Sequence, residues 1–207
     1  MIRLLISIVA LKKWKILQID LNSAFLNGFL DEEVYVEQPE GYVVRGHKDK
    51  VLRLKKALYG LKQAPRVWNS RIDKYFQEKG FKKCPHEHAL YVKMNGKCDI
   101  LIVCLYVDDL IFTGKCAKMF VDFKEEMAEE FEMIAIGLMS YYLGIEVKQR
   151  DDGIFISQEI YAKEVLKRFN MENYNPISIP IDIEKKLWRH VKGGPVDQTL
   201  FKVWLEV

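Results

Sequence analysis

Two adjacent carboxylates, Asp108 and Asp109, interrupt an otherwise apolar stretch between Asp99 and Gly114. An isolated carboxylate is costly to bury, so the chain must turn into water or meet a cation here. The apolar flanks therefore predict a β-hairpin with both aspartates at its tip, and side-chain alternation places Tyr106 and Asp108 on one face. Two like charges at a strand tip form a candidate site for a divalent metal ion. The alternative is a solvated turn, because Asp is common in turns.

A third carboxylate, Asp20, ends a second short strand pattern, which begins at Lys15. If the two strands that end in Asp lie side by side, Asp20, Asp108 and Asp109 surround one or two metal ions. This arrangement is typical of phosphoryl transfer, in which two ions about 3.5–4 Å apart stabilise the attacking and leaving oxygens. We therefore predict that the three carboxylates converge.

The composition is that of a globular chain, since 49% of its 207 residues are hydrophobic and 29% are charged. A chain of this length can bury a full core in one or two domains. Its four cysteines have no C-x-x-C spacing, which is typical of reduced thiols in an intracellular, cytoplasmic protein. No apolar run reaches the ~20 residues of a membrane span, and residues 1–11 predict a core helix rather than a signal peptide.

The net charge is only +3, but the charges are unevenly distributed along the chain. Residues 45–83 contain thirteen Lys or Arg and three Asp or Glu, with aromatic residues between them, whereas residues 122–132 contain six acids and one lysine. A basic, aromatic block beside a carboxylate cluster suits a polyanion that approaches bound metal ions. The alternative is a solvated helix face with core aromatic residues.

Cys84, His86 and His88 form a Cys-x-His-x-His segment with plausible zinc ligands. A structural zinc ion takes four ligands, and no second cluster supplies the others at a familiar spacing. We therefore do not assign zinc to this segment.

Short strands and two longer helices must position these residues. Hydrophobic periodicity and turn residues predict strands at 15–20, 34–38, 51–54, 89–94, 141–147 and 154–156, besides the hairpin at 99–114, and helices at 65–80 and 116–131. A turn of helix is expected between Asp20 and Gly28. Ser157 is expected to cap a third helix, whose apolar side contains Tyr161, Val165 and Phe169. No structure is assigned to the looser segment 176–195, which contains several Pro and Gly residues.

Five motifs in a fixed order resemble those of a known family: residues 18–28 (QIDLNSAFLNG), 34–41 (VYVEQPEG), 58–66 (LYGLKQAPR), 106–109 (YVDD) and 142–147 (YLGIEV). Together they make nearly the whole chain similar to the reverse transcriptase domain of copia-type LTR retrotransposon Pol polyproteins. The resemblance implies an α+β polymerase palm, an antiparallel sheet packed on helices with a ferredoxin-like core. It places partial fingers and palm in residues 1–150 and the start of a thumb or connection in residues 151–207.

The same resemblance implies a two-metal polymerase site. Asp20, Asp108 and Asp109 would be the catalytic residues and would bind two Mg²⁺ ions, or Mn²⁺. The residues that would contact the incoming nucleotide are Ala24, Phe25, Tyr59, Gly60 and Lys62, with Phe25 at the sugar 2′ carbon. Leu143 and Gly144 would form the primer grip, and Arg66 and Tyr106 would contact nucleic acid. The implied partners are an RNA or DNA template with its primer and deoxynucleoside triphosphates, while the oligomeric state is not implied.

Several departures from the family pattern indicate a truncated remnant. Ile134 and Ala135 replace a Lys-Asp pair that the family usually has, and the chain begins at a point in the middle of the family's domain. Residues 203–207 diverge, and no ribonuclease H domain follows. One alternative is therefore an inactive remnant that at most binds nucleic acid. Another is an RNA-recognition module, although the chain lacks the Lys/Arg-Gly-Phe-type strand signature of such modules.

Overall fold

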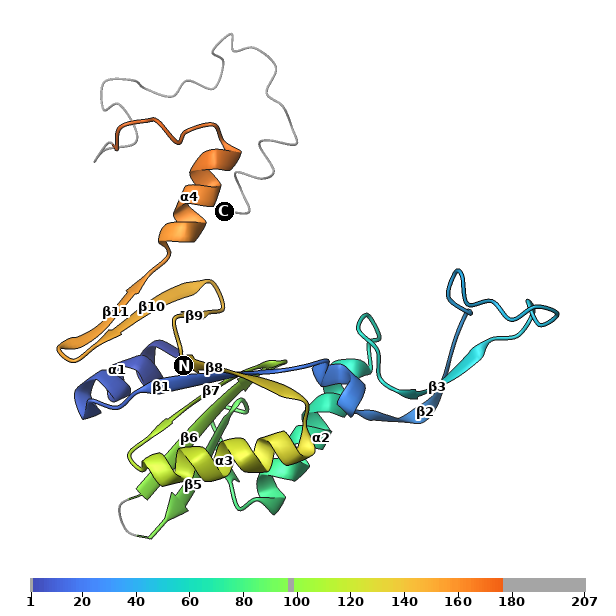
Figure 1. Cartoon of the computed structure of the whole chain (residues 1–207), viewed down its shortest axis with the longest axis horizontal. Coiled ribbons are helices and arrows are strands. Elements are labelled where there is room, and N and C mark those ends of the chain that lie inside the picture. The colour runs from blue at the N-terminus through green and yellow to red at the C-terminus, as the bar shows by residue number, and fades with distance from the viewer. Residues whose placement is uncertain (1, 97–98, 177–207) are drawn as a thin grey trace. The chain divides into compact units, whose positions relative to one another are not determined.

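The computed structural model of the chain describes residues 2–96 and 99–176, which form a mixed α/β fold with antiparallel sheets and four α-helices (Figure 1). The chain divides into two compact units, residues 1–156 and 157–207. All of the predicted site residues belong to the first unit. Within the described part of the chain, no helix has both the length and the apolar character needed to cross a bilayer.

A six-stranded sheet forms the centre of the first unit, with the strand order β4-β5-β6-β7-β1-β8. Its strands are β1 (Ile16–Leu21), β4 (Lys82–Lys83), β5 (Leu90–Asn95), β6 (Asp99–Tyr106), β7 (Asp109–Gly114) and β8 (Met133–Leu138). Each neighbouring pair is antiparallel. β1 therefore lies between β7 and β8, although more than 80 residues of chain separate it from either strand in sequence.

Helices cover both faces of this sheet. The buried residues of α2 (Ala64–Glu78) and α3 (Ala117–Glu130) share one hydrophobic cluster with Ile19 and Leu110. The buried residues of α1 (Ile2–Lys12) belong to a second cluster, which contains Ile16 and Ile111. Since side chains alternate along a strand, these neighbouring cluster members point to opposite faces of the sheet.

The two long predicted helices are confirmed. α2 has Pro in its first turn, and its buried residues recur at helical spacing and include Trp68, Ile72 and Phe76. It ends before Gly80, whose φ of 80° lies in the left-handed region that glycine tolerates. α3 buries Met119, Phe123 and Met127, as its four-residue periodicity predicts. The predicted N-terminal core helix is also confirmed, because α1 buries Leu5, Ile6 and Val9.

Two smaller sheets complete the first unit. β2 (Phe29–Val36) and β3 (Leu52–Lys56) form an antiparallel ribbon, which the sequence predicts with shorter bounds. The second sheet has the order β11-β10-β9 and contains β9 (Tyr141–Tyr142), β10 (Ile145–Arg150) and β11 (Gly153–Ser157). β8 was not predicted from the sequence.

The expected single strand at 141–147 is wrong. The chain reverses at Leu143 and Gly144, whose φ values are 48° and 79°, and Ile145 pairs with Tyr142. Two consecutive residues with positive φ form the type of two-residue turn that matches the twist of a hairpin. The segment is therefore the β9–β10 hairpin.

The second unit contains α4 (Glu159–Arg168). The prediction that Ser157 caps this helix is wrong, because Ser157 is the last residue of β11 and Gln158 occupies the N-cap position. The expected apolar side of the helix is not buried, since none of the α4 residues is. Most of the looser Pro- and Gly-containing segment lies outside the described residues.

Candidate active site

The β6–β7 hairpin, which carries the aspartate pair, turns at Val107 and Asp108. β6 ends at Tyr106 and β7 begins at Asp109, and these two residues pair in the ladder. The prediction that both aspartates lie at the tip is therefore right for Asp108 and wrong for Asp109. The prediction that Tyr106 and Asp108 point to the same face of a strand also fails. Asp108 lies in the turn, where the alternation of side chains along β6 has ended.

Asp20 and Asp109 are direct partners in the antiparallel ladder of β1 and β7. Directly opposite residues point to the same face of a sheet, with Cβ atoms about 4.5–5.5 Å apart. The backbone N–H of Leu21, the residue after Asp20, donates a 2.9 Å hydrogen bond to the carbonyl oxygen of Asp108. The predicted adjacency of the two strands is thus confirmed.

The turn that holds Asp108 has an unusual backbone conformation. Val107 has a φ of 56°, which is unfavourable for a β-branched residue. The indole Nε1 of Trp68 donates a 2.7 Å hydrogen bond to the carbonyl oxygen of Val107. Together with the Leu21 hydrogen bond to Asp108, this contact fixes two successive carbonyl groups of the turn.

The three carboxylates interact electrostatically. The pKa of Asp20 is raised above its ordinary value, first by partial burial and then by the negative charges of Asp108 and Asp109. Both effects disfavour the ionised form of Asp20. A divalent cation at this position would offset the same repulsion.

Each carboxylate of the pair has a polar neighbour from the protein. The side-chain Nε2 of Gln18 donates to Oδ1 of Asp109 over 3.1 Å, and the hydroxyl group of Tyr59 lies beside Asp108. Among residues 2–96 and 99–176, no group of three or more His, Cys, Asp or Glu side chains is close enough to hold a metal ion. The aspartates are therefore neighbours in the fold that do not form an assembled ligand shell.

The chemistry of the three side chains nevertheless suits a metal ion. Carboxylate oxygens are the protein ligands that Mg²⁺ prefers. Without a cation, repulsion between the ionised groups opposes their closer approach, and the polar groups of Gln18 and Tyr59 compensate part of the charge. Asp20, Asp108 and Asp109 are therefore the residues that could hold a divalent ion. The Cys84, His86 and His88 segment belongs to no metal-binding group within the described residues.

Two aromatic side chains lie next to the aspartates. The ring centroids of Phe25 and Tyr59 are 4.6 Å apart, with a tilt of 52° between the ring planes. Phe25 lies on the short 3-10 helix Ala24–Asn27, just after β1, and Tyr59 lies on the loop between β3 and α2. Partial burial, and then the charge of Asp108, raise the pKa of Tyr59. The predicted nucleotide-contacting residues Phe25 and Tyr59 are thus brought together beside Asp108.

The other residues predicted to contact the nucleotide or nucleic acid differ in their exposure. Ala24 is buried, whereas Gly60, Lys62 and Arg66 are exposed on the β3–α2 loop and the first turn of α2. Gly60 has a φ of 90° and nothing within 4 Å of the position where a Cβ would lie. The backbone there is open to a ligand.

Leu143 and Gly144 form the turn of the β9–β10 hairpin. The Leu143 side chain is 40% exposed, while the preceding Tyr142 is buried. The predicted primer-grip residues therefore occupy an accessible turn on a different sheet from the aspartates.

Part of the basic block pairs with the acidic block rather than facing a free groove. Arg71 of α2 forms an ion pair with Glu130 of α3, and Lys79 lies 4.0 Å from Glu126. These contacts join the two helices on one face of the sheet. The exposed Lys62 and Arg66 are better candidates for a polyanion contact than Arg71 and Lys79, which pair with the acids of α3.

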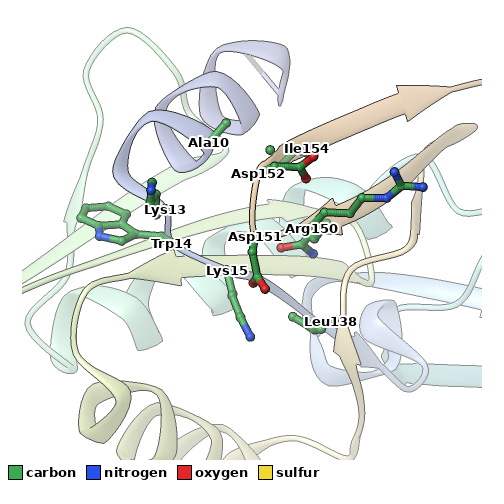
Figure 2. Close-up of a pocket in the computed structure, with 11 residues that line it drawn as sticks. Ala10, Lys13, Trp14, Lys15, Leu138, Arg150, Asp151, Asp152 and Ile154 are labelled. Carbon is green, nitrogen blue, oxygen red and sulfur yellow. The ribbon is translucent and has the colours of Figure 1, made fainter.

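Cavities lie beside the central sheet. One of about 340 Å³ lies between the α1–β1 connection and the β10–β11 hairpin, and its lining includes Lys13, Trp14 and Arg150 (Figure 2). None of the predicted site residues lines it. A second cavity of about 300 Å³ is lined by residues of the candidate site, among them Phe25, Trp68 and Val107.

Two residues at the site were not singled out from the sequence as site residues, namely Gln18 and Trp68. Gln18 is one of the few buried polar side chains and lies two residues before Asp20 on the same strand. A polar residue in a short apolar strand is a usable signal of a buried partner. The Trp68 contact has no such signal, because its spacing fits a core position of α2 equally well.

Comparison with known proteins defines the class of protein. A family model described as reverse transcriptase (RNA-dependent DNA polymerase) matches residues 1–183. The chain belongs to this reverse transcriptase family. Members of the family generally use divalent metal ions and bind a nucleic-acid template and deoxynucleoside triphosphates.

The similar proteins are Pol polyproteins of transposons. The chain is 37% identical over 199 residues to the retrovirus-related Pol polyprotein from transposon TNT 1-94 of Nicotiana tabacum. The aligned region covers 95% of this chain and 15% of that protein. It is 35% identical over 201 residues to the Pol polyprotein from transposon RE2 of Arabidopsis thaliana, covering 97% of this chain and 14% of that protein. A putative transposon Ty5-1 protein of Saccharomyces cerevisiae is 32% identical over 170 residues, covering 82% of this chain and 55% of that protein.

These matches confirm the predicted reverse transcriptase domain of copia-type transposon Pol polyproteins. The chain spans about 15% of the length of the two plant relatives. The activities of those longer proteins as a whole are therefore not assigned to this chain.

Proposed function

We propose that Asp20, Asp108 and Asp109 form the metal-binding centre of an RNA-directed DNA polymerase that extends a primer by nucleotidyl transfer. The observation that carries this proposal is the register that sets Asp20 opposite Asp109, with Asp108 in the adjoining turn. A carboxylate whose pKa is raised by burial and by two neighbouring carboxylates, as that of Asp20 is, suits a divalent cation rather than a structural role.

The chemistry assigned to the site is phosphoryl transfer with two Mg²⁺ ions, or Mn²⁺. When bound, the ions lower the pKa of the primer 3′-hydroxyl group and neutralise charge on the triphosphate and the leaving pyrophosphate. Asp20 and Asp108 provide oxygen ligands from two different structural elements, and Asp109 provides a third from the first residue of β7. Removing a bridging carboxylate would misplace both ions.

The nucleotide site is assigned to the aromatic pair and the loop after β3. The rings of Phe25 and Tyr59 pack against each other beside Asp108, with 4.6 Å between their centroids. A bulky Phe25 beneath the sugar would leave room for hydrogen but not for a 2′-hydroxyl group. The buried Ala24 supports Phe25 from the preceding position. Gly60 permits close approach of a ligand to the backbone, and the exposed Lys62 supplies a positive charge.

The remaining predicted contacts concern the nucleic acid. Arg66 and Tyr106 are exposed and flank the site along α2 and β6, so both are assigned to a template or primer strand. Leu143 and Gly144 are assigned to the primer grip. In these terms residues 1–150 correspond to a ferredoxin-like palm with partial fingers, and residues 151–207 to the start of a thumb or connection.

The test is primer extension on an RNA template with Mg²⁺ and deoxynucleotides, with a parallel reaction in Mn²⁺. The proposal expects extension by the chain and its loss in Asp108→Asn. Asp122→Asn is the matched control, since Asp122 is exposed on α3, away from the aspartate strands. Equal extension by Asp108→Asn and the unmodified chain would refute the proposal.

A second function is favoured by one observation. Ile134, which replaces a lysine usual in the family, is the cross-strand partner of Asp20 on β8. A cation is therefore missing from the strand beside the proposed centre. Salt-sensitive binding of a primer–template without extension would support a chain that binds nucleic acid but is inactive.

A further inference from the structure

We propose that Trp68 is a positioning residue for the metal site, because its indole N–H holds the strained β6–β7 turn and so sets the location of Asp108. This inference rests on the proposed function. It concerns a residue of α2 that none of the sequence motifs assigns to the chemistry. The contact that carries it is the 2.7 Å hydrogen bond from Nε1 of Trp68 to the carbonyl oxygen of Val107.

The turn requires an external restraint. Val107 has a φ of 56°, and L-residues, β-branched ones above all, avoid this left-handed region. Such a conformation persists only where surrounding contacts determine it, and it is frequent at functional sites. Asp108 is the next residue, so the same backbone torsions decide where its carboxylate lies.

Trp68 is well suited to provide that restraint. Its side chain is 2% exposed, and its ring packs edge-on against Phe131, with 5.6 Å between the ring centroids. This packing fixes the direction of the indole N–H. Because the indole nitrogen only donates, the bond to the Val107 carbonyl is the polar contact that this side chain can make in a buried position.

The other restraint on the turn comes from the backbone. The N–H of Leu21 donates to the carbonyl oxygen of Asp108 and belongs to the sheet itself. The cavity of about 300 Å³ that Phe25, Trp68 and Val107 line gives the turn space to move. Loss of the indole N–H would therefore let Val107 relax to a negative φ and displace Asp108, while the sheet stays intact.

The test is Mn²⁺ binding by the full chain without nucleic acid, followed by the electron paramagnetic resonance signal of free Mn²⁺. Trp68→Phe keeps an aromatic ring and removes the N–H. It is expected to bind Mn²⁺ about 10-fold more weakly or worse, within the range for residues that orient metal ligands. Trp14→Phe is the matched control, because Trp14 lies in the α1–β1 connection and lines the other cavity. It should bind as the unmodified chain does.

A rescue experiment separates positioning from general packing. Glycine adopts a positive φ without strain, so Trp68→Phe combined with Val107→Gly should regain much of the lost Mn²⁺ affinity. A packing defect would not be repaired by Val107→Gly. If circular dichroism shows that Trp68→Phe is unfolded, Trp68→Met, which fills irregular apolar space and has no N–H or O–H donor, takes its place.

The outcomes distinguish this inference from the proposed function. Asp108→Asn is measured in the same assay, and unchanged Mn²⁺ binding by that variant would refute the metal site itself. If Asp108→Asn loses Mn²⁺ while Trp68→Phe binds it normally, the metal site stands and the positioning role of Trp68 is overturned. Failure of Val107→Gly to restore affinity in the folded Trp68→Phe chain would also overturn it.

Discussion

Asp20 and Ile134 are direct cross-strand partners on β1 and β8. On the other side of β1, Asp20 faces Asp109, so this carboxylate has a like charge on one neighbouring strand and an apolar side chain on the other. No ion pair in the described part of the chain involves Asp20. The sheet itself therefore leaves the charge of Asp20 uncompensated.

Ile134→Lys should stabilise the metal-free protein at pH 7. Ile134 is 55% exposed, so a lysine there can keep its charge and interact with Asp20 across the strands. A pair of opposite charges on directly facing residues of neighbouring strands adds up to about 1 kcal/mol to the free energy of unfolding. This gain raises the melting temperature of a domain this size by roughly 2–4 °C. Thermal unfolding in a chelator measures the change. Ile136→Lys, two residues further along β8, is the control, and an equal shift in both variants would contradict the pairing.

Asp20→Asn should stabilise the metal-free protein increasingly as the pH rises from 4 to 7. The pKa of Asp20 is raised in the folded state, so the folded protein holds this proton more tightly than the unfolded chain does. The resulting stability is present below the unfolded pKa and is lost as the pH rises through the raised one. Asparagine carries no charge and avoids that loss.

Urea unfolding at several pH values in a chelator measures this effect as the difference in free energy of unfolding between Asp20→Asn and the unmodified chain. Asp122→Asn on the exposed face of α3 serves as the control for removing one negative charge. A difference that stays constant from pH 4 to 7 would show that Asp20 is not perturbed by its neighbours.

Gly114→Ala should disrupt the central sheet. A Cβ at Gly114 would lie 2.1 Å from the carbonyl oxygen of Ile100 on β6, and the atom in its way is backbone. We expect a loss of more than about 3 kcal/mol in the free energy of unfolding, the range of severe core substitutions. Gly153→Ala is the control, because nothing lies within 4 Å of its Cβ position and its φ is not positive. Urea unfolding compares the two, and similar small losses would argue against close approach of β6 and β7.

The sequence was sufficient to predict the elements that have strong periodicity or defined ends. α2 and α3 follow from apolar residues at helical spacing, and β1 and the β6–β7 hairpin follow from short apolar runs that end in Asp. β8 was missed because residues 133–138 have no clear alternation of apolar and polar side chains. Its strand conformation depends on pairing with β1, which lies far away in sequence.

The sequence predicted which residues belong to the candidate site better than it predicted how they are arranged. The five motifs identified the aspartates, Phe25 and the loop after β3, because the family pattern is carried by local segments. The contacts of Gln18 with Asp109 and of Trp68 with Val107 join distant parts of the chain. Such contacts depend on the register of whole strands and helices, which local patterns do not specify.

Gln149 of β10 gives the three-stranded sheet an unusual attachment to β1. Its side-chain amide accepts from the N–H of Ile16 and donates to the carbonyl oxygens of Ile16 and Met139, each over 2.9 Å. The Ile16 amide proton is therefore protected by a glutamine rather than by a neighbouring strand. Its exchange with deuterated solvent would report how often the β9–β11 sheet detaches, separately from the opening of the central sheet.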